Sequence, residues 1–400
     1  MDTKPRRFKE KASKQMRKNM KKIVYITGTR ADYGLMRSTL RSIEKQHNLD
    51  LSLIVTGMHL SHEFGYSMQE IERDNFKIAA KIPALFDQDT GSAMVKSYGR
   101  FIMGLADVLD DVNPNMMLLL GDRWETMAGA VVGAYMNKLV AHVAGGELSG
   151  SIDEPNRHVI TRFAHLHFVA TEDYAQRLVK MGEERHRIYV VGAPGLDDII
   201  IKNYYLPQIV ERKFGLDINE PLLLVVQHPV VAEYEKADEQ MRITLKAVVK
   251  FRHQTIVIYP NADAGGRRMI KVINEYENRF PFLHSYENLS REAFLGLMAV
   301  STVMIGNSSC GLTEAPSFKL PAINIGTRQR GRLRAKNVID VDYDVSEIVA
   351  AIKKALSREF TMKIKDCENP YGDGKTGLRI AHVLRKCKID SNILQKKLAY

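Results

Sequence analysis

The stretch Ile26–Gly34, ITGTRADYG, marks the point where a predicted strand gives way to a candidate site. Ile23–Thr27 is rich in apolar, β-prone residues and predicts a buried strand, and two glycines, an arginine and an aspartate follow it. The stretch is not the GxGxxG of a dinucleotide enzyme, and no isolated acid follows the next strand to bind a ribose. A nicotinamide site is therefore disfavoured. Asp32 could also be no more than the cap of a helix, with Arg30 exposed beside it.

Short apolar segments recur along the whole chain at helix-sized intervals. They are Lys22–Thr27, Leu51–Val55, Met116–Leu120, Leu139–His142, His167–Ala170, Ile188–Val191, Leu222–Val226, Thr255–Tyr259, Val303–Ile305, Ala322–Ile325 and Val338–Val341. Strands that are apolar throughout and separated by helices predict parallel sheets covered on both faces. The expected fold class is α/β, with two Rossmann-like doubly wound domains.

A chain of 400 residues exceeds the size that one hydrophobic core usually supports. We expect a basic flexible leader at 1–21, an N-terminal Rossmann-like domain at 22–200, a C-terminal Rossmann-like domain at 201–375 and a C-terminal helical segment at 376–400. The boundary between the two domains is predicted near Val190–Leu216, where two glycines and a proline interrupt the pattern and a helix-like stretch, Asp197–Phe214, follows.

Charge and cysteine content narrow the class of protein. Residues 1–22 contain ten basic and two acidic residues, so they carry +8 of the net charge of +11 and leave +3 for residues 23–400. A nearly neutral body disfavours a nucleic-acid-binding module, and we expect neither nucleic acid nor a membrane as partner. The leader lacks the apolar core of a secretory signal. Three widely spaced cysteines without a CxxC pair suggest neither a disulfide framework nor a zinc site, which fits a cytoplasmic setting.

Ligands of open α/β sheets bind beyond the carboxyl ends of the strands, so the residues at those ends are the candidates. In LLLGDRWE, Asp122 and Arg123 directly follow a predicted strand. A carboxylate beside a guanidinium suits proton transfer next to a phosphate leaving group, and Arg123 could keep Asp122 ionised. The alternative is a helix cap with a surface ion pair.

The stretch HVAGGELSGSIDEPNRH, residues 142–158, gathers an unusual number of ionisable groups, including Glu147 and Asp153. Its three glycines would let the backbone approach a ligand closely. The alternative is a hydrated loop with internal ion pairs. His165 and His167 follow it, but no third ligand has suitable spacing for a metal, so packed, hydrogen-bonded histidines are expected.

The second half carries groups suited to phosphate. His228 and Asn261 lie at two strand ends, and GNSSCG places Ser308 and Ser309 before a helix expected to open at Gly311. Glu314 could accept bonds from two ribose hydroxyls, and Arg328, Arg330 and Arg332 would supply positive charge to a diphosphate. With the carboxylates in the first domain, this arrangement predicts a cleft that binds a nucleoside diphosphate linked to a reactive group.

Five motifs in order, GTRADYG, GDRWE, GGELSGSIDE, NSSCG and NIGTRQRGR, carry a family resemblance. From about Lys22 onward the chain resembles the hydrolysing UDP-N-acetylglucosamine 2-epimerases, which make N-acetylmannosamine for sialic-acid-type sugars. The resemblance implies a GT-B-type architecture with an interdomain cleft. It implies UDP contacts at Arg30, Ala31, Arg123, His228, Asn261, Leu289, Ser308, Ser309, Glu314 and Arg328, and it implies that Asp122 and Asp153 are active-site carboxylates. We add Glu147 and His228 as further candidate catalytic residues.

One position departs from the family pattern. Many relatives have a glutamate two residues after the first histidine of this stretch, where the present chain has Ala144. Either Glu147 takes over the role or the sugar differs.

The implied reaction expels UDP from C1 as the C2 proton is lost, and water then adds to the 2-acetamidoglucal. It needs no cofactor and no metal. UDP-N,N′-diacetylbacillosamine is the alternative substrate and a GT-B glycosyltransferase the alternative activity. Family analogy implies a homodimer or homotetramer.

Overall fold

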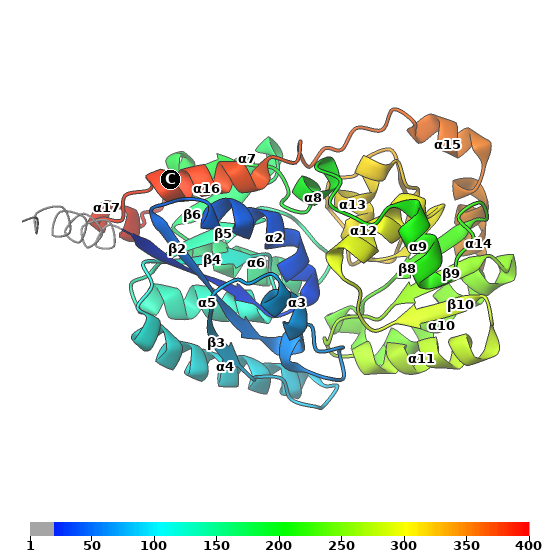
Figure 1. Cartoon of the computed structure of the whole chain (residues 1–400), viewed down its shortest axis with the longest axis horizontal. Coiled ribbons are helices and arrows are strands. Elements are labelled where there is room, and N and C mark those ends of the chain that lie inside the picture. Colours follow the sequence, from blue (N-terminus) through cyan, green and yellow to red (C-terminus); the bar gives the residue numbers. More distant parts are fainter. Residues whose placement is uncertain (1–19, 400) are drawn as a thin grey trace, which may run out of the picture.

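The computed structural model describes residues 20–399, so nearly all of the predicted leader lies outside the described residues. It contains two parallel sheets, each in its own half of the molecule (Figure 1). The seven-stranded sheet has the order β3-β2-β1-β4-β5-β6-β7, and the six-stranded sheet has the order β10-β9-β8-β11-β12-β13. We call these halves the N-terminal and the C-terminal domain. The expected α/β fold with two doubly wound domains is confirmed.

The strands of the first sheet are β1 (Lys21–Thr27), β2 (Leu49–Thr56), β3 (Ile78–Ile82), β4 (Met116–Leu120), β5 (Leu139–Val143), β6 (Leu166–Val169) and β7 (Ile188–Val190). Those of the second are β8 (Leu222–Val226), β9 (Gln254–Ile258), β10 (Leu283–Tyr286), β11 (Val303–Gly306), β12 (Ala322–Ile325) and β13 (Val338–Val341). Every predicted strand is present, and the prediction missed β3 and β10. Both are edge strands and are only partly buried, so their sequences lack a continuous apolar run.

The helices follow the strands in the order of a doubly wound fold. They are α2 (Arg30–Glu44), α3 (Met68–Arg73), α4 (Gly91–Val112), α5 (Trp124–Tyr135), α6 (Asp153–Phe163), α7 (Glu172–Lys180), α8 (Leu196–Ile200), α9 (Pro207–Phe214), α10 (Ala237–Val248), α11 (Gly266–Arg279), α12 (Arg291–Val300), α13 (Cys310–Thr313), α14 (Val345–Ala355), α15 (Arg358–Ile364), α16 (Thr376–Lys386) and α17 (Ser391–Leu394). The single helix expected over Asp197–Phe214 is wrong, because Lys202 adopts a φ of +55° and Pro207 starts a new helix.

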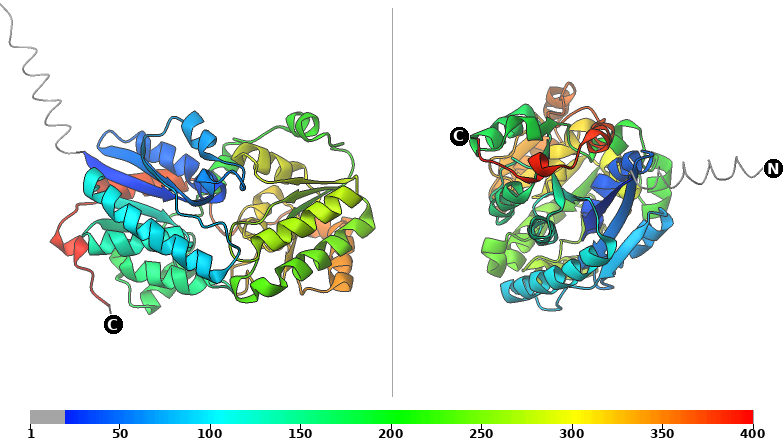
Figure 2. Two further views of the ribbon diagram at one scale, coloured as in Figure 1. Left: turned by 90° about the horizontal axis from the view of Figure 1, so that it is seen from below. Right: turned by 90° about the vertical axis from the view of Figure 1, so that its left-hand side faces the viewer.

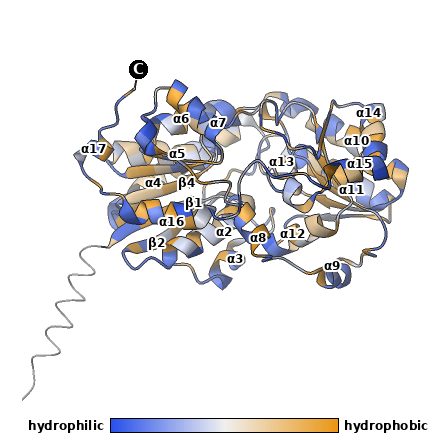
Figure 3. Cartoon of the chain, turned by 90° about the horizontal axis from the view of Figure 1, so that it is seen from above, coloured by the Kyte–Doolittle hydropathy of each residue, from blue (hydrophilic) through white to orange (hydrophobic). Residues whose placement is uncertain are grey.

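Each sheet is buried on both faces, as its apolar strands require. In β1, Ile23 and Tyr25 pack toward α2 and α16, while Val24 and Ile26 pack toward α4 and α5. The second sheet is covered by α12 on one face and by α10, α11 and α14 on the other. Figure 3 shows hydrophobic residues concentrated along the strands at the centre of each half. Burial on both sides leaves only the strand ends free to carry polar groups.

The end of the chain returns to the N-terminal domain. Helix α16 packs beside α2, far from the C-terminal sheet that precedes it (Figures 1 and 2). The Asp197 carboxylate accepts hydrogen bonds from the backbone N–H of Thr376 at 3.0 Å and of Gly377 at 2.8 Å, which caps α16. Further on, the Lys396 ammonium donates to the carbonyl of Thr161 at 2.7 Å. The chain therefore crosses between the domains twice.

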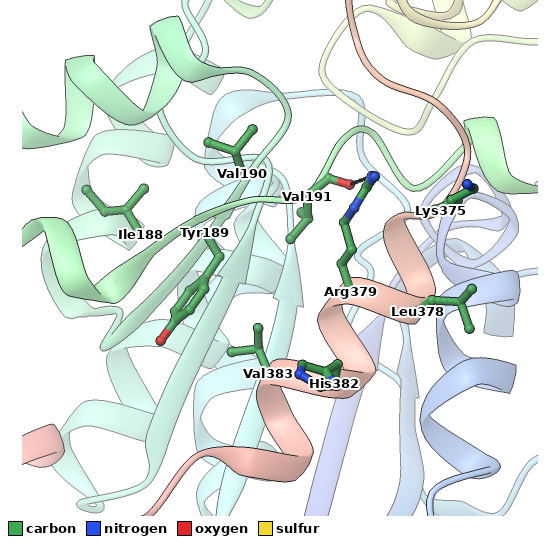
Figure 4. A pocket seen from close by; sticks show the side chains of 9 residues that line it. All are labelled: Ile188, Tyr189, Val190, Val191, Lys375, Leu378, Arg379, His382 and Val383. Atoms are coloured by element: carbon green, nitrogen blue, oxygen red, sulfur yellow. Dashed lines mark hydrogen bonds between the residues drawn. The ribbon is translucent and has the colours of Figure 1, made fainter.

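A shallow groove marks the contact between α16 and the edge strand β7 (Figure 4). Arg379 on α16 spans it and donates to the carbonyl of Val191 at 3.0 Å. Tyr189, Leu378 and Val383 line it as well. None of the predicted site residues lies here, so this groove is separate from the candidate site.

Candidate active site

A cavity of ≈ 340 Å³ lies between the two domains, within the size range of small-molecule sites. It is lined by Arg30, Ala31, Asp122, Arg123, Glu147, Asp153, His228, Asn261, Leu289, Ser308, Ser309, Glu314 and Arg328, all of them predicted from the sequence. Of the two further arginines expected to supply charge to a diphosphate, Arg332 lines the cavity, but Arg330 is exposed outside it, so that expectation is wrong for Arg330. The lining residues follow the carboxyl ends of strands from both sheets. The fold thus brings residues almost 300 positions apart in the sequence to one interdomain cavity.

The loop after β1 owes its shape to Asp32. The carboxylate accepts hydrogen bonds from the backbone N–H of Gly28 at 3.0 Å and of Thr29 at 2.8 Å, and the Thr29 side chain caps α2 in return. The capping alternative is correct only in part, because Thr29 is the N-cap, Asp32 is the N3 residue of its capping box, and Arg30 is mostly buried instead of exposed. Arg30 forms an ion pair with Glu70 at the cavity wall.

Asp122 pairs with Arg157 of α6 and not with its neighbour Arg123. Arg123 instead bonds Glu125, with Nε 3.1 Å from Oε2, and Asp263, with Nη1 3.3 Å from Oδ1. The expectation that Arg123 keeps Asp122 ionised is therefore wrong, because the strand end turns the two side chains toward different partners. The side chain of Arg157 is only 1 % exposed. A guanidinium that is buried to this degree needs a carboxylate partner.

The sequence interpretation did not select Arg157. The feature that could have identified Arg157 is its place in the stretch 142–158, which is rich in ionisable residues. It lies one turn along α6 from Asp153. Arg157 also donates to the carbonyl of Glu147 at 2.9 Å. It thus joins the end of β4 to the loop after β5.

His142 of β5 supports the turn that carries Asp122. Its Nε2 donates to the carbonyl of Gly121 at 2.7 Å, and Gly121 has a φ of +78°, in the left-handed region. Burial lowers the pKa of His142 to about 3, so its imidazole is neutral.

The loop after β5 presents two carboxylates to the cavity. Glu147 is buried, and its Oε2 lies 3.0 Å from Nη2 of Arg332. Burial raises the pKa of the Glu147 carboxyl, and the charge of Arg332 opposes that rise. Asp153 has its Oδ2 3.3 Å from Nη2 of Arg328. These ion pairs cross to the other domain, so the loop is not a hydrated one closed on itself.

His228 lies at the end of β8, beside the arginines of the cavity. Its Nδ1 accepts from the backbone N–H of Asn261 at 3.2 Å, so the ring proton sits on Nε2. Burial, with the charges of Arg328 and Arg123 adding to it, lowers the pKa of His228 to about 3. A neutral imidazole with a free N–H can donate to an anionic oxygen.

The NSSCG segment follows β11. The Asn307 side chain accepts from the backbone N–H of His228 at 2.7 Å and donates to its carbonyl at 2.8 Å, which fixes the two strand ends together. Helix α13 begins at Cys310, one residue before the predicted start, and has only four residues. A helix this short contributes little dipole, so Ser308 and Ser309 would act through their hydroxyls and backbone N–H groups. Glu314 forms an ion pair with Arg291, a second cavity residue that the sequence interpretation did not select.

The paired histidines are structural. His165 Nδ1 accepts from the backbone N–H of Val140 at 3.0 Å, and His167 Nε2 lies 3.1 Å from the Glu183 carboxylate. The expectation of packed, hydrogen-bonded histidines is confirmed. Within residues 20–399, no three His, Cys, Asp or Glu side chains are grouped so that they could hold a metal ion. No helix in the same range is both long enough and apolar enough to span a bilayer.

Comparison with known proteins places this chain in a family. A family model described as UDP-N-acetylglucosamine 2-epimerase matches residues 41–385. The chain is 41% identical over 381 residues to the UDP-N,N′-diacetylbacillosamine 2-epimerase (hydrolyzing) of Legionella pneumophila, covering 95% of this chain and 100% of that protein. It is 37% identical over 340 residues to a UDP-N-acetylglucosamine 2-epimerase of Neisseria meningitidis, covering 84% of this chain and 88% of that protein.

A solved structure agrees at the level of the fold. The crystal structure of a UDP-GlcNAc 2-epimerase from Neisseria meningitidis bound to UDP-GlcNAc superposes with a TM-score of 0.78 at 20% identity, covering 92% of this chain and 100% of that one. The family model covers most of the chain and the curated relatives cover nearly all of it. The chain therefore belongs to the UDP-N-acetylglucosamine 2-epimerase family.

Proposed function

We propose that this protein is a hydrolysing UDP-sugar 2-epimerase that converts UDP-N-acetylglucosamine and water to N-acetylmannosamine and UDP. One observation carries the proposal: a single cavity joins three carboxylates of the N-terminal domain to the arginines, serines and histidine of the C-terminal domain. Proton transfer at a sugar carbon needs the first set, and a departing diphosphate needs the second.

In the first step Asp122 accepts the C2 proton. Its carboxylate lies against the buried guanidinium of Arg157, which fixes its position at the cavity. The electron pair of the C2–H bond forms the C1=C2 bond of 2-acetamidoglucal, and the C1–O bond breaks with its electrons leaving on UDP. Arg123, Arg328 and the neutral His228 lie at the cavity to stabilise the diphosphate as it leaves.

In the second step water adds across the double bond. The hydroxyl goes to C1, and a proton goes to C2 on the face opposite to the one that lost it. Glu147 suits the donor, because burial raises its pKa and it holds a proton closer to neutral pH than an exposed carboxyl does. Asp153 lies at the same cavity, where it would orient the attacking water and accept the proton that the water loses as its hydroxyl adds to C1. With these roles the loop after β5 supplies the carboxyl that Ala144 cannot.

A second substrate has support of its own. The Legionella pneumophila relative, at 41% identity, is named for UDP-N,N′-diacetylbacillosamine, which leads to legionaminic acid, and it matches 95% of this chain. Both sugars carry an acetamido group on C2, the carbon that loses its proton in the elimination, so the same three carboxylates serve either one.

The discriminating experiment offers each UDP-sugar to the enzyme with water as the only acceptor. We expect UDP release from at least one of them, with the preferred sugar showing the higher kcat/KM. A GT-B glycosyltransferase would release no UDP without an acceptor sugar. The Asp122→Asn variant, prepared in parallel, controls for contaminating phosphatase activity.

We also propose a homodimer or homotetramer in a cytoplasmic setting, with no nucleic acid or membrane partner. The exposed apolar residues Val95 and Met103 of α4 and Tyr135 of α5, two helices packed together, support self-association. Light scattering on the purified protein gives its mass, and a monomer at micromolar concentration would contradict this part.

A further inference from the structure

Two loops from different domains meet backbone to backbone at one side of the cavity. We call residues 147–153 the carboxylate loop and residues 327–332 the arginine loop. The backbone N–H of Gly150 donates to the carbonyl of Arg328 at 3.0 Å, and Nε of Arg332 donates to the carbonyl of Leu148 at 3.3 Å. The two loops therefore hold the domains together independently of any ligand.

Gly150 makes this close approach feasible. A Cβ at this position would lie 1.9 Å from the carbonyl oxygen of Thr327, so no other residue fits without displacing the arginine loop. The contact is with backbone, which cannot swing away as a side chain could. Residue 150 thus sets how near the carboxylates come to the arginines.

Two charges of each loop pair across the interface. Arg332 bonds Glu147 with Nη2 3.0 Å from Oε2, and Arg328 bonds Asp153 with Nη2 3.3 Å from Oδ2. Arg328 has only one other partner among the described residues, the carbonyl of Asn307 at 3.4 Å from Nη1. The side chains of Arg328 and Asp153 are 14% and 17% exposed and line the cavity beside Ser308.

Arg328 therefore faces two competing anions when a nucleotide enters. A diphosphate carries more negative charge than one carboxylate and offers oxygens that a guanidinium can bind in a bidentate manner. The contact to Asp153 joins one nitrogen to one oxygen at 3.3 Å, so it is weaker than bidentate binding of a diphosphate.

We propose that Arg328 exchanges Asp153 for the diphosphate when a UDP-sugar binds, so that nucleotide binding itself frees Asp153 for catalysis while the Gly150 contact keeps the cavity closed. The inference deepens the proposed function and rests on it. It makes Asp153 a competitor of the nucleotide in the free enzyme and a free carboxylate in the complex. The enzyme would then expose this carboxylate only when a substrate is present.

Calorimetry with UDP tests the exchange, because the exchange makes an unusual prediction. Asp153→Asn removes the competing anion, so UDP should bind about two- to fivefold more tightly, the value expected for one partly exposed ion pair. Arg328→Gln should weaken UDP binding at least about tenfold. In the double variant the gain from Asp153→Asn should vanish, since no arginine is left to release.

Two results overturn the exchange. Unchanged or weaker UDP binding by Asp153→Asn shows that the two anions do not compete. An equal gain in the Arg328→Gln background shows a general charge effect and no exchange. If Asp153→Asn does not fold, Asp153→Ser serves in its place with the same expected gain. Wild-type protein that does not bind UDP contradicts the proposed function itself, a result distinct from these.

The backbone contact has its own test. Gly150→Ala should weaken UDP binding at least about tenfold, because its Cβ forces the loops apart. Gly99→Ala in α4 is the matched control, since a Cβ there meets nothing within 4 Å. Wild-type affinity in Gly150→Ala would show that closure through this contact is not needed.

Discussion

Arg157 shows how much of the site depends on pairings that no local sequence pattern reveals. Sequence reasoning identified the ionisable residues around the cavity, but it assigned Arg123 to Asp122 because the two are adjacent. In the structure Asp122 pairs with a residue 35 positions away, and Arg123 reaches Asp263 of the other domain. Which charges meet is set by how strand ends and helices pack, so the residue types were predictable and their partners were not.

The first prediction concerns Asp122. Asp122→Asn should lower kcat at least about a hundredfold while UDP binding persists, because the change removes the base and leaves the diphosphate contacts in place. Steady-state kinetics and calorimetry measure the two effects separately, and Asp110→Asn on the exposed side of α4 is the control. A near wild-type rate would remove Asp122 from the mechanism.

The second prediction concerns Glu147. Glu147→Gln keeps the shape of the side chain but removes the proton donor, so kcat should fall at least about a hundredfold. The assay follows UDP release together with deuterium at C2 in D₂O. If Glu147→Gln is nearly silent and Asp153→Asn is inactive, the donor is Asp153. If both are silent, the chemistry lies elsewhere in the cavity.

Among elements, the central strands were the most predictable because they are apolar throughout. The edge strands β3 and β10 were missed, since partial exposure removes that signal. The helix expected over Asp197–Phe214 failed for another reason. Apolar residues continue through the break, where Lys202 adopts a positive φ and Pro207 starts a new helix.

The third prediction concerns the cap of α16. Asp197 is buried and accepts two backbone N–H groups across a gap of 179 residues, so it fixes the start of this helix on the N-terminal domain. Asp197→Ala should lower the free energy of unfolding by about 1–2 kcal/mol. Asp344→Ala, which caps α14 at the surface, should cost less. Equal urea midpoints for both variants would show that burial of the cap adds nothing.

At the scale of the whole molecule, two doubly wound domains and a cleft between them were predictable from the order of strands and the residues at their ends. The return of α16 to the first domain and the contact between the carboxylate and arginine loops were not. Both depend on contacts between segments more than 170 residues apart, for which one sequence holds no periodic signal.

The fourth prediction is a loss of stability in mild acid. Burial lowers the pKa of His59, His142 and His228 to about 3, against an unfolded value of 6.5. Between pH 6.5 and 3 the unfolded chain binds protons that the folded chain does not. The free energy of unfolding therefore has its full value above pH 6.5 and decreases as the pH falls through this range. Each histidine changes the free energy of unfolding by about 1.4 kcal/mol per pH unit, and the three together change it by about 4 kcal/mol per pH unit.

Urea denaturation at pH 7, 6 and 5 measures this slope, the change in the free energy of unfolding per pH unit. Substituting one of the three, as in His228→Asn, should reduce the slope by about 1.4 kcal/mol per pH unit, whereas the exposed His47→Gln should leave it unchanged. A midpoint that stays constant from pH 7 to pH 5 would contradict the burial of these rings.

The most direct test of the account follows the sugar itself by NMR in D₂O, with UDP-N-acetylglucosamine and UDP-N,N′-diacetylbacillosamine as separate substrates. The account predicts UDP and a free sugar that has the inverted configuration at C2 and one deuterium at that carbon. Release of a free sugar with C2 unchanged and without deuterium would show simple hydrolysis at C1, and would contradict the assignment of the carboxylates to proton transfer at C2.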